Sequence, residues 1–265
     1  MANKYLSFFK KKVDIKSNFL YNSWQGDFMQ RYFAKEKEKN KFILLDSDIH
    51  HIKKVMRMKN KDQIEVLLDK KLYLCEINNI ETDIEIKILK EIKTNQDNFP
   101  KVTLIIPLLK EQKMDLILQK STELGVDEII PIITERSVVK IDAKKEAKKL
   151  ERWTRICKEA SEQSHRIDIP KISNIRRILE LKDIKGVKFV CSTTQKTKNL
   201  KKLLKTNPSC DRINIAIGPE GGFSIKEEKE FNELGFESIT LGNRIMRVET
   251  VPMFVLSIVN YEFME

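Results

Sequence analysis

Two stretches decide the fold: Ile213-Asn-Ile-Ala-Ile-Gly-Pro-Glu-Gly-Gly-Phe-Ser224 and Leu241-Gly-Asn-Arg-Ile-Met-Arg-Val-Glu-Thr250. In each, a short apolar strand leads into a loop that carries glycine. Glycine has no Cβ, so such loops bring bare backbone close to a ligand. Ser224 and Glu227 have the spacing of a capping box, which begins a helix. The first stretch is therefore predicted to form a strand, a tight loop and a helix.

The glycine loop from Gly218 to Gly222 lacks the signatures of phosphate-binding loops. A P-loop ends in Gly-Lys-Ser/Thr, and the dinucleotide fingerprint reads Gly-x-Gly-x-x-Gly. The loop matches neither pattern. It is better suited to a cofactor without phosphates, and a pair of ordinary βα turns is the alternative.

Strands and helices alternate from residue 101 to the end of the chain. Apolar runs predict strands at 102–109, 129–133, 187–191, 213–217 and 238–241, and helical patterns cover 111–125, 142–164 and 251–263. This alternation predicts a mostly parallel sheet covered by helices on both faces. Ligands of such sheets bind beyond the carboxyl ends of the strands, which is where Gly218 and Gly242 stand.

The preceding part of the chain has a shorter hydrophobic period. Strand-like runs cover 42–45, 63–68, 72–77 and 84–89. One helical stretch, 47–58, is predicted to place Ile52, Val55 and Met56 on one face. We expect a small β-barrel-like domain here. Residues 91–99 are polar and precede Pro100, which indicates a linker to the next domain.

Composition bounds the function. The 265 residues include 50 Lys and Arg against 39 Asp and Glu, a net charge of +11. This surplus favours an anionic partner, nucleic acid first, and a lysine-rich solvated surface is the alternative. The four cysteines are scattered and no His lies at metal-ligand spacing, so a reducing cytoplasm fits and no metal site is expected. The longest apolar run, 251–263, is too short for the ~20 residues of a membrane span.

Several separated motifs occur in one order along the chain. They are Lys113-Met-Asp-Leu-Ile-Leu-Gln-Lys-Ser-Thr-Glu-Leu-Gly125, Glu135-Arg-Ser-Val-Val-Lys140, Arg152-Trp153, Glu159-Ala-Ser-Glu-Gln-Ser164, Gly218-Pro-Glu-Gly-Gly222 and Arg247-Val-Glu-Thr250, preceded by His50-His51 and Val55-Met-Arg-Met58. Together they closely resemble the ribosomal RNA small subunit methyltransferase E family, from about Met29 to Glu265.

The resemblance implies a fold and an activity. The fold is α/β: a SPOUT-type methyltransferase domain at 101–265 with a mostly parallel sheet and a trefoil knot, preceded by a PUA-like RNA-binding barrel at 29–92 and a linker at 93–100. The activity is S-adenosylmethionine-dependent methylation of N3 of one uridine in the 16S RNA of the small ribosomal subunit, by a cytoplasmic homodimer. The alternatives are a non-catalytic RNA-binding or ribosome-assembly factor and a SPOUT methyltransferase that acts on transfer RNA.

The chain departs from the family pattern in two places. Residues 1–28 precede the usual start at Met29, and we interpret them as a misassigned start rather than a native extension. Val251-Pro252-Met253 stands where the family has small residues, which could change packing at the cofactor loop or dimer face. Pro252 falls in the first turn of the final helix, where a missing amide is tolerated, so the fold is expected to survive.

The cofactor is expected to contact mainly backbone. One wall is assigned to Ile217, Gly218, Gly221 and Gly222, the other to Leu241, Gly242, Ile245 and Met246, and a weaker contribution to Ser192 and Thr194 after strand 187–191.

Methylation at N3 makes two chemical demands. The imide nitrogen must lose a proton, and negative charge then spreads onto O2 and O4, so a base and a cation are needed. Arg247 suits the oxyanion, and Glu249 suits proton acceptance or the orientation of Arg247. Glu220 is a competing base. An ion pair of Arg247 with Glu249 that only shapes the loop is the alternative.

Basic residues in both domains are candidates for RNA phosphates. They are Arg31, His50, His51, Lys53, Lys54, Arg57 and Lys59 in the first domain and Arg136, Arg152, Arg155 and Arg166 in the second. Tyr32 and Phe33 are predicted to be core residues of a first strand rather than stacking platforms for bases. Trp153 is predicted to pack within its helix.

Overall fold

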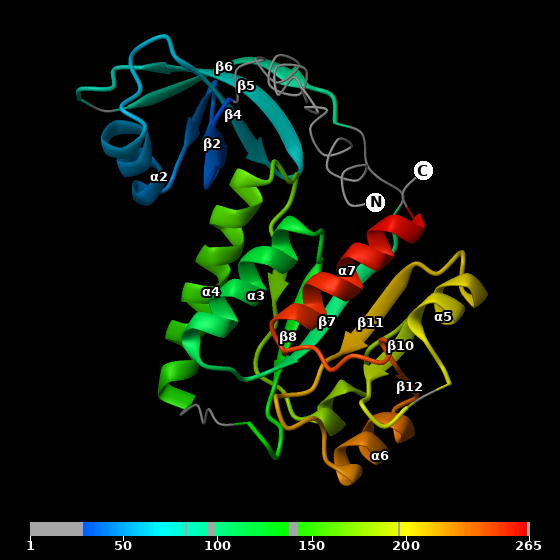
Figure 1. Cartoon of the computed structure of the whole chain (residues 1–265). Helices are drawn as coiled ribbons and strands as arrows, with labels where there is room; N and C mark the ends of the chain where they lie inside the picture. Colours follow the sequence, from blue (N-terminus) through cyan, green and yellow to red (C-terminus); the bar gives the residue numbers. More distant parts are fainter. Residues whose placement is uncertain (1–28, 83, 95–98, 138–142, 196, 264–265) are drawn as a thin grey trace, which may run out of the picture. The chain divides into compact units, whose positions relative to one another are not determined.

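The structure is a computed structural model that describes residues 29–82, 84–94, 99–137, 143–195 and 197–263. These residues form two compact units (Figure 1). The first runs from the start of the described chain to Val66 and includes Tyr73–Glu91, and the second comprises Leu67–Leu72 and Ile92–Glu265. The proposed misassigned start, residues 1–28, lies outside the described residues, as does part of the linker, residues 95–98.

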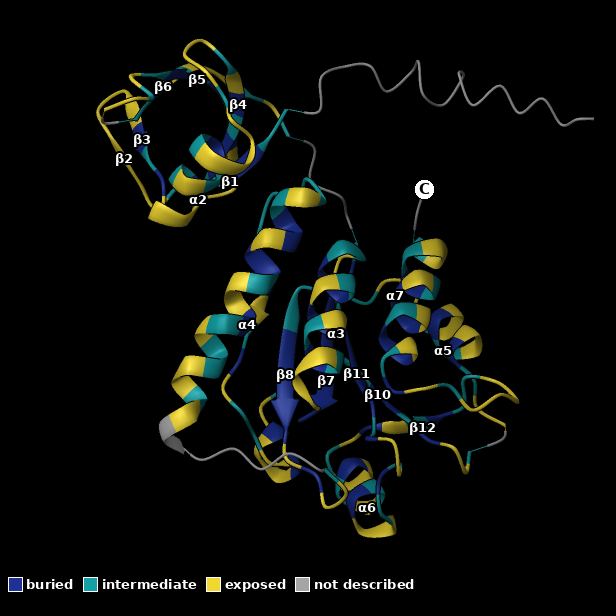
Figure 2. Ribbon diagram, turned by 60° about the vertical axis from the view of Figure 1, so that its left-hand side comes forward, coloured by how far each residue is buried: buried dark blue, intermediate teal, exposed yellow. Residues whose placement is uncertain are grey.

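The first unit is built on a six-stranded sheet in the order β1-β4-β5-β6-β3-β2. The strands are β1 (Arg31–Phe33), β2 (Glu36–Glu38), β3 (Lys41–Ile43), β4 (Gln63–Leu68), β5 (Lys71–Asn78) and β6 (Glu85–Ile92). Alternate residues such as Cys75 and Ile77 of β5 are 0% exposed, the period expected of strands with one buried face. Figure 2 shows the sheet curving around this buried interior.

The helical stretch of this unit corrects one expectation. Helix α2 (Asp46–His50) continues into a π-helix, η1 (His51–Val55), in which the Met56 amide donates to the His51 carbonyl. Ile52 is buried, but Val55 is 60% and Met56 40% exposed, so the predicted shared apolar face is wrong. The reason is the wider π turn, because its five-residue step rotates the residues after Ile52 away from an α-helical face.

The second unit contains a six-stranded sheet in the order β12-β10-β11-β7-β8-β9. Its strands are β7 (Lys101–Pro107), β8 (Glu128–Ile132), β9 (Lys171–Ile172), β10 (Val187–Cys191), β11 (Arg212–Ala216) and β12 (Glu237–Ile239). Each neighbouring pair is parallel. Because both faces are covered, the central strand β7 is buried along almost its whole length, as the continuous apolar run predicted.

Helices cover both faces of this sheet (Figures 1 and 2). One face packs against α3 (Glu111–Glu123), α4 (Ala143–Gln163), α5 (Leu200–Thr206) and α7 (Thr250–Phe263), and the other against α6 (Ile225–Glu233) and the 3-10 helix η2 (Ile178–Leu181). Leu104 and Ile106 of β7 enter the first core, and Ile105 enters the second. Trp153 is 3% exposed in the first core, which confirms its predicted packing role.

The chain returns from the sheet edge to its middle at the C-terminus. After the edge strand β12, residues 240–249 lead to α7, which packs against α3 and α5. The Asn260 amide on α7 donates to the Leu124 carbonyl at 2.9 Å. Pro252 is buried in the first turn of α7, and the helix forms around it as expected.

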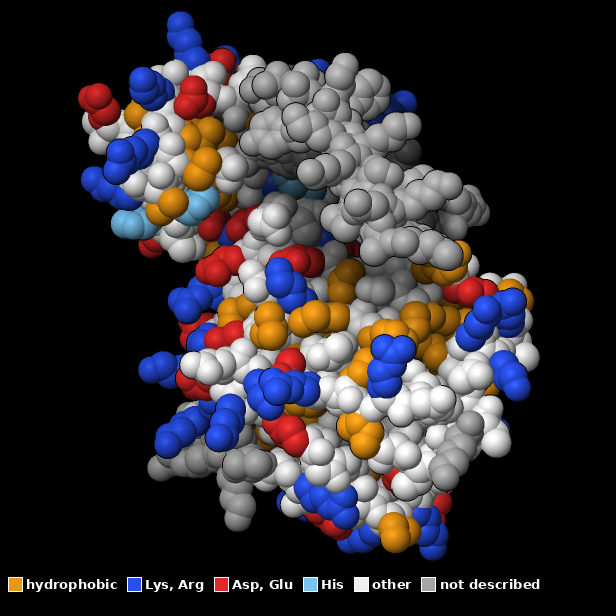
Figure 3. Space-filling view, in the orientation of Figure 1, with side chains coloured by type: hydrophobic (Ala, Val, Ile, Leu, Met, Phe, Trp, Pro, Cys, Tyr) orange, Lys and Arg blue, Asp and Glu red, His pale blue; other side chains and the backbone are white. Residues whose placement is uncertain are grey.

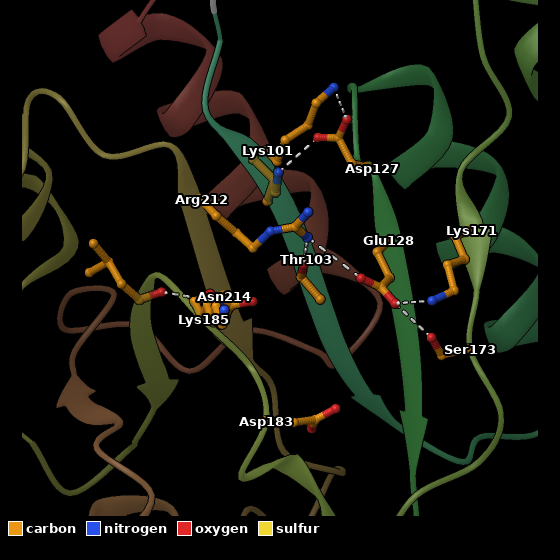
Figure 4. A network of polar contacts seen from close by, with 12 residues as sticks. Lys101, Thr103, Asp127, Glu128, Lys171, Ser173, Asp183, Lys185, Arg212 and Asn214 are labelled. Atoms are coloured by element: carbon orange, nitrogen blue, oxygen red, sulfur yellow. Dashed lines mark hydrogen bonds and ion pairs between the residues drawn. The ribbon is translucent and has the colours of Figure 1, made fainter.

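Polar side chains join the amino ends of the parallel strands (Figure 4). The Lys101 amine lies 2.8 Å from the Asp127 carboxylate. Glu128 accepts from the Ser173 hydroxyl at 2.7 Å and lies 3.5 Å from the Arg212 guanidinium. These contacts tie together β7, β8, β11 and the segment after β9. This edge is thus occupied by its own ion pairs, and the loops that carry the site candidates lie at the opposite edge.

Candidate active site

The predicted cofactor loops lie at the carboxyl ends of neighbouring strands. Residues 217–224 follow β11, residues 240–249 follow β12, and Ser192 follows β10, which pairs with both. Ser192 extends the strand pairing, since its amide donates to the Ile239 carbonyl at 2.9 Å. Its hydroxyl is 2.9 Å from both Thr194 and the Glu228 carboxylate on α6. The sheet therefore brings the three predicted cofactor segments to one edge.

The first loop is a tight turn that favours glycine at two places. A Cβ on Gly218 would lie 3.2 Å from the Phe223 nitrogen and 3.3 Å from Gly222 backbone atoms. Gly222 has φ +68°, a conformation that other residues adopt at a cost. Its amide donates to the Pro219 carbonyl at 2.8 Å. The bare backbone expected of this loop is thus present.

A neighbouring loop braces the glycine turn. The Arg136 guanidinium donates to the Gly221 carbonyl and, at 3.5 Å, to the Phe223 carbonyl. The Glu135 amide donates to the buried Glu227 carboxylate at 2.7 Å. Arg136 was predicted as an RNA contact, and in the structure its guanidinium is engaged with the loop. The brace was not predicted, because no local pattern links residues 85 and more positions apart.

The capping box that begins α6 is confirmed. The Ser224 hydroxyl accepts from the Glu227 amide at 3.2 Å, and the Glu227 carboxylate accepts from the Ser224 amide at 2.8 Å. These bonds satisfy two of the free amides at the start of the helix. These two bonds therefore fix the end of the glycine loop to the first turn of α6.

Replacing this cap should lower stability measurably. We expect Ser224→Ala to reduce the free energy of unfolding by about 1 kcal/mol, because an N-cap acceptor is lost. Urea titration of the purified protein measures the change. Ser209→Ala, at an exposed position, is the matched control and should stay within about 0.5 kcal/mol of the parent. Equal stability of the parent and Ser224→Ala would show that the box contributes nothing.

The second loop contains one glycine with a positive φ and two side chains that anchor it to the core. Gly242 has φ +114°, where an L side chain is strained. Leu241 and Met246 pack against the first core. Ile245 is 88% exposed, and its predicted cofactor contact stays a prediction.

Lys113 on α3 joins two of the predicted catalytic residues. Its amine lies 2.7 Å from Glu220 Oε1 on the first loop and 3.6 Å from Glu249 Oε2 on the second. The hydrogen bond to Glu220 raises the pKa of Lys113 above its ordinary value. The same bond lowers the pKa of Glu220. The structure therefore places Glu220 and Glu249 around one cation.

Glu249 and Arg247 differ in their surroundings. Glu249 Oε2 is buried and has no hydrogen-bond partner among the described residues. The Arg247 side chain is exposed, and within the described ranges it makes no hydrogen bond or ion pair. These contacts thus include no Arg247–Glu249 ion pair, because the Glu249 carboxylate faces Lys113 instead.

Lys113 was not predicted as a site residue, although one feature of its position indicates such a role. Lys113 begins a motif that was recognised, and it lies in the first turn of α3. The positive end of the helix dipole disfavours a cation there. A lysine at such a position indicates an acidic partner from elsewhere in the chain.

In the first unit, the RNA-binding candidates divide into engaged and exposed side chains. The buried Arg31 guanidinium lies 2.6 Å from Glu65. His51 Nδ1 is 3.0 Å from the hydroxyl of Tyr32, which is 3% exposed as predicted for a core aromatic. Lys53 donates to the Thr82 carbonyl at 3.1 Å. Exposed candidates remain on one short stretch: His50, Lys54, Arg57 and Lys59.

In the second unit, the arginine candidates also have protein partners. Arg152 lies 2.5 Å from the Asp115 carboxylate. Arg166 is mostly buried and donates to the Thr122 carbonyl and to Asp168, both at 2.9 Å. Arg155 is 65% exposed, and its contact to Glu159 is long, at 3.9 Å. Arg155 is thus the most accessible of these three.

Within the described ranges, no group of three or more His, Cys, Asp or Glu side chains is arranged to hold a metal ion. No helix in those ranges has the length and apolarity that crossing a membrane requires.

Known proteins resemble this chain over almost its whole length. Family models for an RNA methyltransferase domain and an RNA methyltransferase PUA domain match residues 95–260 and 44–90. Ribosomal RNA small subunit methyltransferase E of Bacillus subtilis is 33% identical, covering 88% of this chain and 97% of that protein. The Mesomycoplasma hyopneumoniae protein of the same name is 37% identical, covering 86% and 98%.

A solved structure has a similar fold. Ribosomal RNA small subunit methyltransferase E from Neisseria gonorrhoeae, bound to S-adenosylmethionine, has a TM-score of 0.78 and 32% identity, covering 88% of this chain and 97% of that one. The α/β class expected from the sequence, a parallel catalytic sheet preceded by a small β unit, is confirmed. The chain belongs to the ribosomal RNA small subunit methyltransferase E family, with a SPOUT-type methyltransferase domain that follows a PUA-like domain.

Proposed function

We propose that this protein methylates N3 of a specific uridine in 16S RNA of the small ribosomal subunit, with S-adenosylmethionine as methyl donor. The observation that carries the proposal is Glu249 Oε2, a buried carboxylate oxygen that lacks a hydrogen-bond donor in the described structure. This oxygen forms an ion pair with Lys113 at 3.6 Å but accepts no hydrogen bond, and a buried acceptor in that state favours a ligand donor. The N3–H of uridine is such a donor.

The residues around the two loops fit this cofactor. Gly218 and Gly242 present backbone that a side chain would obstruct or strain. Glu220 and Glu249 supply negative charge near a ligand that carries a sulfonium. When bound, the cofactor supplies a methyl group on positively charged sulfur. We assign binding to Ile217, Gly218, Gly221, Gly222, Leu241, Gly242, Ile245 and Met246, with Ser192 and Thr194 at the edge.

The protein's own groups would manage proton and charge. Glu249 accepts the N3 proton, which makes the nitrogen a better nucleophile and lowers the barrier to methyl transfer. Arg247, two residues before Glu249, has an exposed side chain and is suited to stabilise the negative charge on O2 or O4 of the uracil base. Exposed basic side chains of the PUA-like domain, such as Lys54 and Arg57, bind RNA phosphate in a salt-dependent way.

The proposal extends to assembly and domain bounds. The PUA-like domain is assigned to residues 29–92 and the methyltransferase domain to 101–265. We propose a cytoplasmic homodimer, supported by apolar side chains gathered over α3 and α7 of the second unit (Figure 3). Leu116 and Phe254 are each 38% exposed there.

Transfer of labelled methyl tests the function. The protein is mixed with labelled S-adenosylmethionine and, separately, unmethylated small subunits, naked 16S RNA and transfer RNA, and the modified nucleotide is mapped. We expect methyl at N3 of one 16S uridine. Methyl on transfer RNA would show that transfer RNA is the substrate in place of 16S RNA. Binding of RNA without any methyl transfer would favour a non-catalytic assembly factor.

A further inference from the structure

Lys113 contacts both glycine loops from a rigid helix. It lies in the first turn of α3, whose residues Met114 and Ile117 are buried in the core. Its amine meets Glu220 at 2.7 Å and Glu249 at 3.6 Å. The first carboxylate belongs to the loop after β11, the second to the loop after β12. One side chain thus links the two halves of the site.

The two carboxylates use Lys113 differently. Glu220 is 48% exposed at its side chain, and its Oε1 accepts the lysine hydrogen bond. Glu249 is 16% exposed, and its Oε2 faces the lysine at ion-pair distance without a hydrogen bond. A carboxylate already bonded to a cation is a weaker proton acceptor than one with a free lone pair. The low pKa of Glu220, caused by its bond to Lys113, points the same way.

We propose that Lys113 is a positioning residue that fixes Glu249 for proton transfer, with Glu220 as the anchor of the lysine and not as the base. This inference rests on the proposed function, since it concerns the same reaction. It assigns separate roles to two glutamates that the sequence left as competitors. Glu220 holds the amine in place, and the amine in turn fixes where the Glu249 carboxylate lies.

Kinetics of Lys113 variants test this role. At saturating cofactor and RNA, we expect Lys113→Met to lower the single-turnover rate of methyl transfer about tenfold, because a misplaced base slows the chemical step. Lys113→Arg, which keeps the charge, should recover most of the rate. The dissociation constant for S-adenosylmethionine, measured by calorimetry, should stay within about twofold, since a rate effect alone marks an interaction used in the transition state.

Lys120→Met is the matched control for these variants. Lys120 lies on the same helix and forms an ion pair with Glu123 at 2.8 Å, so its loss removes a similar contact away from the loops. Its rate should equal that of the parent. An unchanged rate in Lys113→Met, or an equal loss of rate and cofactor affinity, would overturn the positioning role.

A second measurement needs no activity. The side-chain NMR signal of Lys113, identified by its absence in Lys113→Arg, should shift in both Glu220→Gln and Glu249→Gln and stay unchanged in Glu123→Gln. A signal that moves in neither of the first two variants would refute the link between the loops, even in a protein without measurable transfer. Methyl mapped to a nucleotide other than uridine would instead remove the proposed function and leave the Lys113 comparison intact.

Discussion

Glu249→Gln should lower the single-turnover rate of methyl transfer about 10²–10⁴-fold, the range for removal of a general base. The amide is nearly isosteric with the carboxylate but accepts no proton, so the N3 proton of the base has no acceptor. Glu249 Oε2 has no hydrogen-bond partner in the described structure, and the substitution breaks no such bond there. Rapid-quench kinetics with labelled cofactor measures the rate.

Glu123→Gln on α3 controls for loss of a carboxylate that pairs with lysine. This variant should keep the parental rate. Cofactor affinity should be nearly unchanged in Glu249→Gln, because the proton acceptor acts in the chemical step. A Glu249→Gln protein with close to parental rate would exclude Glu249 as the base, and the same test on Glu220→Gln would then decide whether Glu220 takes that role.

Gly218→Val should weaken binding of S-adenosylmethionine about 100-fold. The first added carbon would lie 3.2 Å from the Phe223 nitrogen and 3.3 Å from Gly222 backbone. Backbone cannot yield as a flexible side chain does, so the loop must shift, and overpacking of this kind costs roughly 1–3 kcal/mol. Isothermal titration calorimetry with the purified protein measures the affinity.

Gly235→Val separates binding from folding. Gly235 follows α6 in the same unit, with φ +82° and open space at its Cβ, so valine there adds backbone strain away from the proposed site. It should lower the melting temperature and leave cofactor affinity close to parental. Parental affinity in Gly218→Val would place the cofactor elsewhere.

Local pattern was sufficient for much of the second unit. Strand β10 occupies the predicted residues 187–191, and the capping box at Ser224 forms as its spacing predicted. Strands β2 and β9 were not predicted, since β2 is polar and exposed at all three residues and β9 has only two, so neither carries a readable hydrophobic period. The π turn after His50 was missed for a related reason, because its step departs from the helical period assumed.

The site was predicted by loop position but not by partner. Glycine and its place after a strand located the cofactor loops, and the resemblance supplied the catalytic candidates. Which side chain contacts which could not be read, because Lys113 and Glu220 are 107 residues apart and Arg136 lies 85 residues from Gly221. Arg166 illustrates the same limit. Its charge suggested an RNA contact, but its guanidinium donates hydrogen bonds to Thr122 and Asp168.

The parallel sheet also determines when the protein becomes competent during its synthesis. Its central strand β7 pairs along one side with β11, beginning with Lys101 opposite Arg212, so a long intervening segment must be made before that ladder can close. Such distant pairing is entropically costly and slow to form. Glu249 is synthesised later still, after Arg212. A chain that has not yet reached Glu220 therefore carries Lys113 without either glutamate that it contacts, and the site cannot form until synthesis has passed Glu249.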